Sequence, residues 1–280
     1  MGISTQDIKK LRDMTGAGMM DCKKALTEAD GDFDKAIEEL RKKGQKLSAK
    51  RADREAKEGV VIAETSGNRN NGVLVKLSCE TDFVAKNEDF IGLGKTIAGI
   101  ALKNLPNSKD ELLALPFDSS ISIGEKVVEQ IGVIGEKVEV DAYEKIETAA
   151  GEGQVLSYIH MGYKAGVLVA LNLEGPDYIE PGRDVAMQVA AMKPIALDKD
   201  GVDATVVEKE IEIGKEVARK EGKPEAMLEK IATGKLNKFF KENTLLNQAF
   251  VKDGKMNVQA YLQSKHKDLT VTSFKHIKLG

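Results

Sequence analysis

Gly72-Val73-Leu74-Val75-Lys76-Leu77 recurs later in the chain as Gly166-Val167-Leu168-Val169-Ala170-Leu171. Each copy follows a second apolar segment that begins with Glu-Gly, at residues 58–62 and 152–156. The β-branched and apolar content and the glycine boundary predict a pair of antiparallel strands in each copy. A helical pattern follows each pair, over residues 90–101 and 185–190. The sequence therefore predicts an α+β core of two repeated α/β subdomains with antiparallel sheets.

Two more strands and a helical insertion complete the predicted core. Residues 136–140 and 269–274 are candidates for a third strand in each subdomain. Between residues 203 and 243, apolar positions follow a helical spacing on both sides of a Gly-Lys-Pro break. This pattern predicts an inserted antiparallel helical hairpin with a narrow apolar seam. Arms of some 18 residues would reach about 27 Å, so we expect the hairpin to project from the body, where it could also brace an oligomer.

Residues 4 to about 44 have the pattern of three short helices separated by glycine turns. Their apolar stripes are Ile8, Leu11 and Met14; then Met19, Cys22, Ala25 and Leu26; then Phe33, Ala36, Ile37 and Leu40. Three such helices resemble the ubiquitin-associated fold, and a unit this small is marginally stable alone. We therefore expect a UBA-like domain over 1–45, a basic linker over 46–57 that could also be an exposed helix, core subdomain 1 over 58–146, and core subdomain 2 over 147–280.

Composition narrows the class of function. The chain has 280 residues, 41% hydrophobic, and a net charge of −3, which gives no overall bias toward nucleic acid. Its start has no signal-peptide pattern, and no apolar run approaches the roughly 18 residues of a membrane span. We expect a cytoplasmic protein with reduced cysteines and no membrane partner. With three histidines in the chain, we expect no metal site and no cofactor.

Several motifs that suggest chemistry fail on closer reading. Residues 92–96 look like a phosphate-binding loop, but that motif needs a glycine five positions before Gly94, and Asp89 stands there. Residues 16–18 lack the third glycine of a dinucleotide-binding fingerprint. An enzyme would draw on Cys79, Asp82 and His160, which the repeat assigns to two different subdomains. Strand alternation is expected to bury Cys79, and no nucleophile motif surrounds it. We therefore expect no catalytic residues.

Thr81-Asp82-Phe83-Val84-Ala85-Lys86 follows the second predicted strand, where a helix begins and side chains are offered on a rigid support. Taken alone, Phe83 is expected to lie in the core. Near the N-terminus the chain reads Arg12-Asp13-Met14-Thr15-Gly16-Ala17-Gly18-Met19-Met20-Asp21-Cys22-Lys23. The two segments, in this order and at this separation, resemble the bacterial elongation factor Ts family. The resemblance covers nearly the whole chain.

The resemblance implies a guanine-nucleotide exchange factor that performs no bond chemistry of its own. Its partner would be elongation factor Tu, both GDP-bound and nucleotide-free. In this family, residues matching Thr81, Asp82, Phe83 and Val84 displace the partner's magnesium and phosphate-loop contacts, with Phe83 as an apolar wedge and Asp82 as its support. The resemblance assigns the hairpin 203–243 to a coiled coil that also contacts the partner.

Further partner contacts carry over by position: Arg12, Met19, Met20, Lys23, Ile134, Gly135, His160 and Val251. Of the two methionines, we expect one to face the core and one to face outward. Lys252 stands where the family pattern has an apolar residue. The chain ends at Gly280, where some members continue into a helical module, so we expect a smaller interface. A homodimer, or a heterotetramer with the partner, is left open.

Two rival functions remain open at this point. The eight cations between residues 41 and 57 could bind RNA, although such a run is more often solvated. Residues 1–45 could instead act alone as a peptide- or ubiquitin-type adaptor. No direct nucleic-acid contact is expected under the exchange-factor interpretation.

Overall fold

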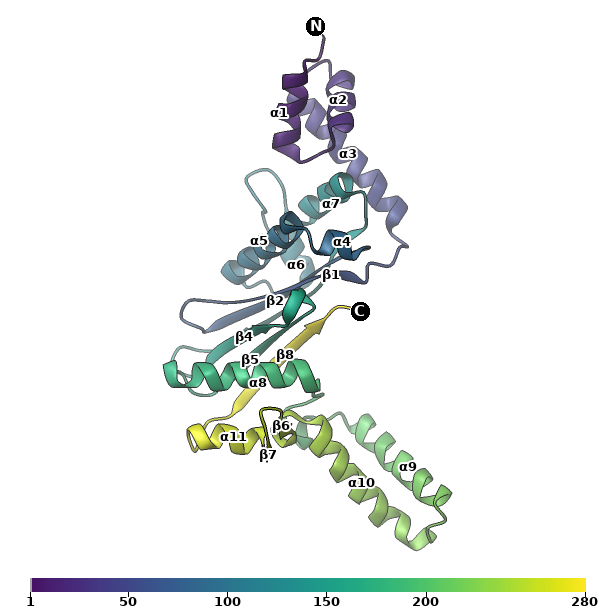
Figure 1. Ribbon diagram of the computed structural model, residues 1–280, viewed down its shortest axis with the longest axis vertical. Helices are drawn as coiled ribbons and strands as arrows, with labels where there is room; N and C mark the ends of the chain where they lie inside the picture. The colour runs from purple at the N-terminus through teal and green to yellow at the C-terminus, as the bar shows by residue number, and fades with distance from the viewer. Residues whose placement is uncertain (1) are drawn as a thin grey trace.

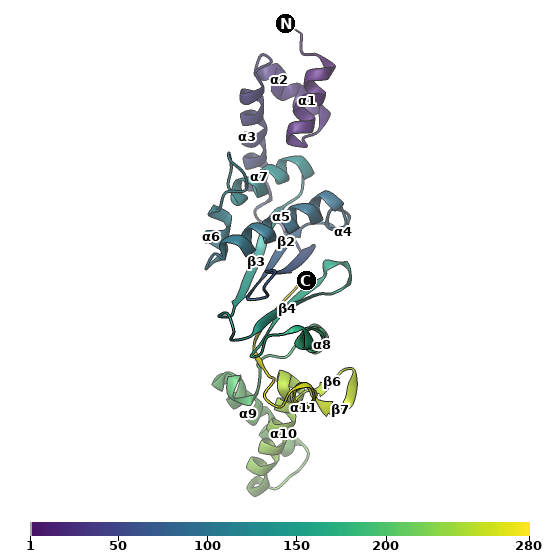
Figure 2. The same ribbon diagram turned by 90° about the vertical axis from the view of Figure 1, so that its left-hand side faces the viewer.

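A computed structural model describes residues 2–280 as an elongated molecule (Figures 1 and 2). A three-helix unit forms one end, two layered sheets form the middle, and a helical hairpin forms the other end. The predicted α+β class, with antiparallel sheets and an inserted hairpin, is confirmed. Within residues 2–280, no helix combines the length and the apolarity needed to cross a membrane. The predicted domain boundaries stay a prediction.

The N-terminal unit consists of α1 (Thr5–Thr15), α2 (Met19–Glu28) and α3 (Phe33–Arg51). Its helix ends follow from local chemistry: Ser4 forms a capping box with Asp7, and Gly16 ends α1 in the left-handed region at φ +71°. A small cluster that includes Leu11, Cys22 and Leu26 fills the centre. Helix α3 continues beyond residue 45, so much of the predicted linker is helical.

The first sheet contains β1 (Glu58–Thr65), β2 (Asn71–Cys79) and β3 (Val138–Glu147), antiparallel in that order. The helices between β2 and β3 are α4 (Asp82–Ala85), α5 (Glu88–Asn104), α6 (Lys109–Ala114) and α7 (Ile123–Ile134). Side chains of α5, α6 and α7 pack on the outer face of this sheet in one apolar cluster with Ile62 and Val75. The helices α6 and α7 were not among the elements expected from the sequence.

The second sheet contains β4 (Gln154–Ile159), β5 (Ala165–Leu171) and β8 (Val271–Lys278). Its outer face is covered by α8 (Ile179–Met192) and α11 (Val258–Lys265), and a two-stranded hairpin is formed by β6 (Ala249–Phe250) and β7 (Asp253–Asn257). Short 3-10 turns are η1 (Met161–Tyr163), η2 (Pro176–Tyr178), η3 (Lys199–Gly201), η4 (Glu225–Met227) and η5 (Leu245–Asn247).

The inner faces of the two sheets pack on each other through the repeated segments. A Cβ atom added to Gly72 would lie 2.7 Å from Val155 Cγ1 and 2.9 Å from Leu168 Cδ2. One added to Gly166 would lie 2.8 Å from Val61 Cγ1 and 3.1 Å from Leu74 Cδ2. The lack of a side chain at Gly72 therefore makes room for Leu168, and the lack of one at Gly166 makes room for Leu74.

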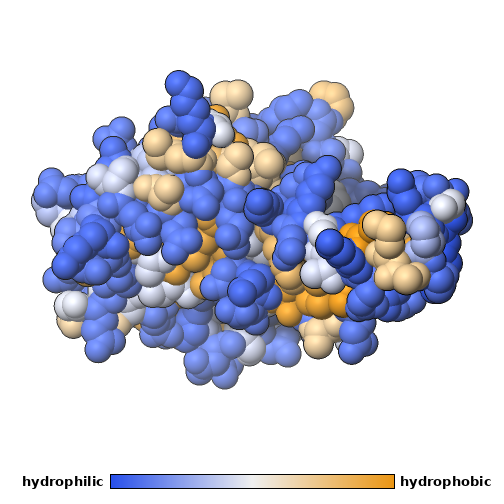
Figure 3. All heavy atoms as spheres, turned by 90° about the horizontal axis from the view of Figure 1, so that it is seen from below, coloured by the Kyte–Doolittle hydropathy of each residue, from blue (hydrophilic) through white to orange (hydrophobic). Residues whose placement is uncertain are grey.

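The projecting hairpin consists of α9 (Ala204–Lys220) and α10 (Leu228–Asn243). Its seam is thin, because Gly214 packs directly against Ala232: an added Cβ would lie 3.0 Å from the Ala232 Cα. Ion pairs flank the seam, including Lys215 with Glu229 at 2.8 Å. Seen from this end, the molecule is largely hydrophilic with separate apolar patches (Figure 3).

We expect Gly72→Val to lower the free energy of unfolding by about 1–3 kcal/mol, because the added methyl groups overpack the space between the sheets. Urea unfolding followed by circular dichroism measures the change. Gly92→Ala is the matched control: Gly92 lies in α5 with nothing within 4 Å of an added Cβ, so it should be neutral or slightly stabilising. Equal stability of Gly72→Val and wild type would contradict the packing described.

Candidate protein-binding surface

Phe83 has the most exposed aromatic side chain among the described residues. It lies in α4, the four-residue helix that follows the end of β2, and 82% of its surface is exposed. A phenylalanine is usually buried, so the expectation from the residue alone, that Phe83 closes the core, is wrong. The half-buried neighbours Val84 and Ala85 pack on the core cluster in its place.

The turn that carries Phe83 is held by a carboxylate from a distant segment. Glu136 accepts a hydrogen bond from the Thr81 amide at 3.0 Å and another from the Thr81 hydroxyl at 2.7 Å. The Thr81 hydroxyl oxygen in turn accepts from the Val84 amide at 3.4 Å and so caps α4. The Cys79 thiol donates to the Thr81 carbonyl oxygen at 3.2 Å. Phe83 is thus offered to solvent on a short helix whose start is fixed.

The neighbouring residue, Glu80, joins three segments. Its carboxylate accepts from the Lys137 amide at 2.6 Å, from Arg51 Nη1 at 2.6 Å and from Arg54 Nη1 at 2.9 Å. Burial acts to raise the pKa of Glu80, but the hydrogen bonds from Lys137, Arg54 and Arg51 outweigh it and lower the pKa to about 2. The end of α3 is therefore tied to the ends of β2 and α7.

Two of the segments that the family resemblance assigns to partner contacts, residues 81–84 and 134–135, lie next to each other. Ile134 is half-buried on the core cluster, and Gly135 ends α7 in the left-handed region at φ +79°, directly before Glu136. Residues 81–84 and 134–135 thus form one surface. Asp82 pairs with Lys86 at 2.6 Å, and the hydrogen bond from Lys86 lowers the pKa of Asp82.

The predicted contacts of the N-terminal unit are all exposed: Arg12, Met19, Met20 and Lys23. Met20 is 76% exposed and Met19 is 39% exposed, so the expectation that one of them faces the core is wrong. The buried stripe of α2 begins at Cys22 instead. Met14, expected in the apolar stripe of α1, is also exposed. A groove lies between the C-terminal end of α1 and the first subdomain, lined by Met14, Val84, Phe90, Val133 and Ile134 among others.

The remaining predicted contacts lie on the second subdomain. His160 follows β4, and its Nδ1 is 3.3 Å from the Tyr158 hydroxyl oxygen. Turn η1 comes next and reaches the first subdomain, where Lys95 Nζ lies 5.7 Å from the centre of the Tyr163 ring. Figure 2 shows α4, the loop after β4 and the β6–β7 hairpin along the same side of the molecule. Within the two subdomains, the segments that carry the predicted contacts thus lie along one edge of the molecule rather than in one pocket.

Val251 lies in the β6–β7 turn and is 47% exposed. Its amide donates to Gln188 Oε1 at 2.8 Å. Lys252 pairs through Nζ with the buried Asp184 at 2.6 Å, and the Tyr261 hydroxyl donates to the same carboxylate at 2.6 Å. Lys252 therefore compensates a buried negative charge, and this contact fixes the turn on α8.

The chemistry of an enzyme is not supported at Cys79. Burial, together with the negative charge of Glu136, raises the pKa of the Cys79 thiol to about 12, so it stays protonated at neutral pH. Among residues 2–280, no group of three or more His, Cys, Asp and Glu side chains is arranged to hold a metal ion.

The basic run at residues 41–57 is largely paired within the protein. Cations that face a carboxylate are Lys42, Lys43, Arg51, Arg54 and Lys57. Cations that are already neutralised release fewer counterions on binding a phosphate backbone, which weakens the RNA-binding alternative.

Three parts that hold this surface together were not expected from the sequence: α7, Glu80 and Glu136. A signal for α7 was present, since Ser122 and Glu125 form a capping box before the apolar series Ile123, Val127, Ile131 and Ile134. The two glutamates gave no local signal, because their partners lie far along the chain.

Comparison with known proteins agrees with these features. The family model described as elongation factor TS matches residues 80–280. The chain belongs to the elongation factor Ts family. It is 55% identical over 279 residues to elongation factor Ts of Cytophaga hutchinsonii and 52% over 278 residues to that of Flavobacterium psychrophilum, with 99% of each chain covered. It is 50% identical over 281 residues to elongation factor Ts of Amoebophilus asiaticus, with both chains fully covered. The resemblance inferred from the two motifs is confirmed.

We expect Glu80→Gln to lower the free energy of unfolding at pH 7 by about 1–3 kcal/mol, since the two arginines lose their charged partner. The folded-state pKa of Glu80, about 2, lies below its ordinary value of 4.5. Its contribution is therefore present above about pH 4.5 and is lost as the pH falls toward 2. Urea unfolding at pH 7, 5 and 3 should show that the free energy of unfolding falls more steeply with decreasing pH for the wild type than for Glu80→Gln.

Glu55→Gln is the control for this prediction. Glu55 pairs with Lys57 at 2.6 Å, but both side chains are exposed, so the substitution should leave stability nearly unchanged. Parallel pH profiles for the wild type and Glu80→Gln would contradict the role given to Glu80.

Proposed function

We propose that this protein is the guanine-nucleotide exchange factor of elongation factor Tu and acts in the cytoplasm. It would bind the GDP-bound form, promote GDP release and leave the partner free to take up GTP, with no bond chemistry of its own. The observation that carries the proposal is Phe83, an 82% exposed phenylalanine on a turn that Glu136 holds in place. Membership of the elongation factor Ts family supports it.

The mechanism follows from linkage. A GTPase of this kind holds GDP through backbone N–H groups of its phosphate loop and through a magnesium ion. A protein that binds the empty form more tightly than the GDP-bound form must weaken GDP binding by the same factor. Phe83, with Thr81, Asp82 and Val84 around it, would supply this difference by entering the partner beside its magnesium site and displacing the contacts there.

The geometry of the turn suits this role. An apolar side chain that is exposed before binding gains the full free energy of burial when it enters a partner. The Thr81–Glu136 contacts hold the helix start before binding, so little additional backbone ordering is needed. Asp82 would give up Lys86 for a polar group of the partner and so support the wedge.

The other predicted contacts would act as grips that hold the partner against the wedge. Met19 and Met20 offer adaptable apolar surface, flanked by the cations Arg12 and Lys23. Ile134 and Gly135 lie beside the wedge, and His160 and Val251 extend the contact along the edge of the second subdomain. The hairpin formed by α9 and α10 would be a further arm.

We expect Phe83→Ala to fold normally and to lower the rate of GDP release by about thirtyfold or more, because truncating a buried interface anchor costs about 2 kcal/mol or more. Phe83→Leu should give an intermediate rate, since it keeps part of the apolar volume. Ile195→Ala is the control, as Ile195 is an exposed apolar residue outside α4. A wild-type rate for Phe83→Ala would contradict the wedge.

Release of a fluorescent GDP analogue from elongation factor Tu tests the proposed function itself. The proposal predicts faster release with sub-stoichiometric amounts of this protein, which shows turnover. Tight binding without faster release would indicate a storage or chaperone role instead. Absence of both binding and acceleration would reject elongation factor Tu as the partner.

A further inference from the structure

The N-terminal unit is joined to the core by a very close helix crossing. Helix α3 passes α7 with Gly44 and Gly132 at the contact. A Cβ atom added to Gly44 would lie 2.8 Å from the Val128 carbonyl oxygen, and one added to Gly132 would lie 3.1 Å from the Gly44 Cα. The obstacle at Gly44 is backbone, which cannot turn aside as a side chain can. Only glycine permits this approach.

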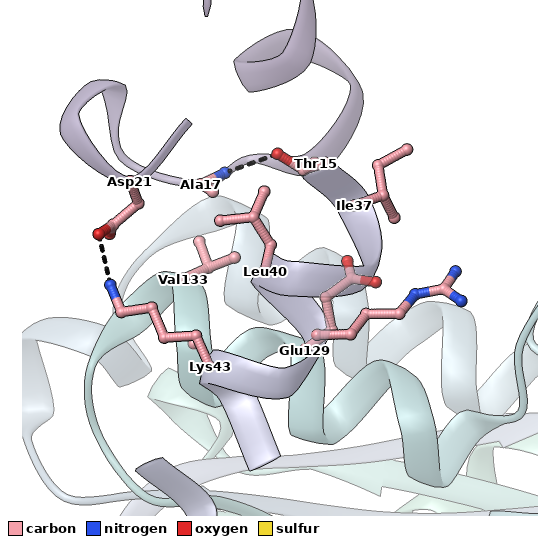
Figure 4. A pocket seen from close by; sticks show the side chains of 10 residues that line it. Thr15, Ala17, Asp21, Ile37, Leu40, Lys43, Glu129 and Val133 are labelled. Atoms are coloured by element: carbon pink, nitrogen blue, oxygen red, sulfur yellow. Dashed lines mark hydrogen bonds and ion pairs between the residues drawn. The ribbon is translucent and has the colours of Figure 1, made fainter. Parts of the chain in front are cut away.

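Side chains close around the crossing on both sides. Figure 4 shows Leu40 of α3 and Val133 of α7 in the pocket between the N-terminal unit and the core. Lys43 of α3 reaches back to Asp21 of α2, with Nζ 2.5 Å from Oδ1. Further along α3, Leu47 packs on the core cluster of the first subdomain. The N-terminal unit is thus held to the first subdomain by side-chain packing as well as by its covalent connection.

The end of α3 is fastened a second time. Arg51 pairs with Glu80, as described above, and Lys137 Nζ donates to the carbonyl oxygens of Ala52 at 3.1 Å and Arg54 at 3.0 Å. These contacts fix the segment that sequence alone suggested as a linker.

The C-terminal end of α7 and the two residues that follow it therefore contact both halves of the proposed interface within the five residues 132–136. Gly132 contacts α3, which belongs to the unit that carries Met20, and Glu136 holds Thr81 beside Phe83. We propose that α7 is a rigid strut that fixes the position of the N-terminal methionines relative to Phe83, so that the two bind one partner as a single body. Gly44, Gly132 and Glu136 are then positioning residues. The effect of this strut on nucleotide exchange rests on the proposed function, whereas the rigidity of the link between the N-terminal unit and the core does not.

A rigid strut has a clear energetic advantage over a tether. A flexibly linked second grip is present at an effective concentration that its linker limits, and ordering it on binding costs free energy. A grip that is already in place avoids that cost. Loss of the strut should therefore weaken partner binding while the step at Phe83 continues, which separates KM from kcat.

Distance measurement in the isolated protein tests the rigidity. Spin labels on Lys24→Cys in α2 and Lys103→Cys in α5 report the separation of the two parts, and the native Cys22 and Cys79 are fully buried and protected from labelling. We expect one narrow distance distribution for the otherwise wild-type protein and a broad one with Gly44→Leu. Gly234→Leu, on α10 with nothing within 4 Å of an added Cβ, should stay narrow. A broad distribution without Gly44→Leu would overturn the proposal.

Exchange kinetics test the consequence. We expect Gly44→Leu to raise the KM for GDP-bound elongation factor Tu about tenfold with kcat nearly unchanged. Met20→Ala should raise KM in the wild-type background and have no effect in the Gly44→Leu background, because the methionine is then no longer positioned. Equal effects of Met20→Ala in both backgrounds would overturn the strut. If the leucine variant melts at a much lower temperature, Gly44→Ala gives the same comparisons with a smaller displacement.

The two proposals fail in different ways. If the wild type shows no exchange activity, the proposed function is wrong, and the spin-label distances still decide whether α7 is rigid. If exchange is present and the distances are broad, the exchange function stands and the strut is wrong.

Discussion

The two sheets depend on one reciprocal contact, in which Leu168 packs over Gly72 and Leu74 packs over Gly166. Strands such as β1 and β5 are apolar on both faces, so each sheet needs a cover on both sides. The other sheet covers one face and helices cover the other. With both faces occupied, the ends of strands and helices are the places where side chains can be offered to a partner, and Phe83 and His160 lie there.

Charged contacts then convert this scaffold into a defined surface. The adjacent residues Glu80 and Thr81 bond to the adjacent residues Lys137 and Glu136, which joins the start of α4 to the end of α7. These bonds are partly shielded from water, where charge-assisted hydrogen bonds are strong. An exchange factor needs no reactive group of its own. In the proposed function it needs an apolar side chain that can enter the partner beside its magnesium site, and the hydrogen bonds from Thr81 to Glu136 hold the start of the helix that carries this side chain.

Local patterns in the sequence predicted the repeat, the glycine turns and the hairpin, because these follow from periodicity and from residues that break it. They failed where a contact across the chain decides the outcome. Phe83 is exposed because Val84 and Ala85 pack beneath it, and Met19 is exposed because Cys22 takes the buried position. The ion pair of Lys252 depends on Asp184, which lies in α8, 68 residues earlier in the chain. Family membership could be inferred from two motifs. The hydrogen bonds of Glu80 with Arg51, Arg54 and Lys137 could not, because these residues come together only in the folded chain.

Calorimetric binding to two forms of elongation factor Tu distinguishes a wedge at Phe83 from an ordinary interface anchor. The affinities of the wild type and of Phe83→Ala would be compared for the nucleotide-free and the GDP-bound partner. Because exchange requires a preference for the empty form, we expect Phe83→Ala to lose more affinity for the nucleotide-free partner than for the GDP-bound one. Equal losses for both forms would make Phe83 an ordinary anchor and contradict the proposal that it acts as a wedge that promotes GDP release.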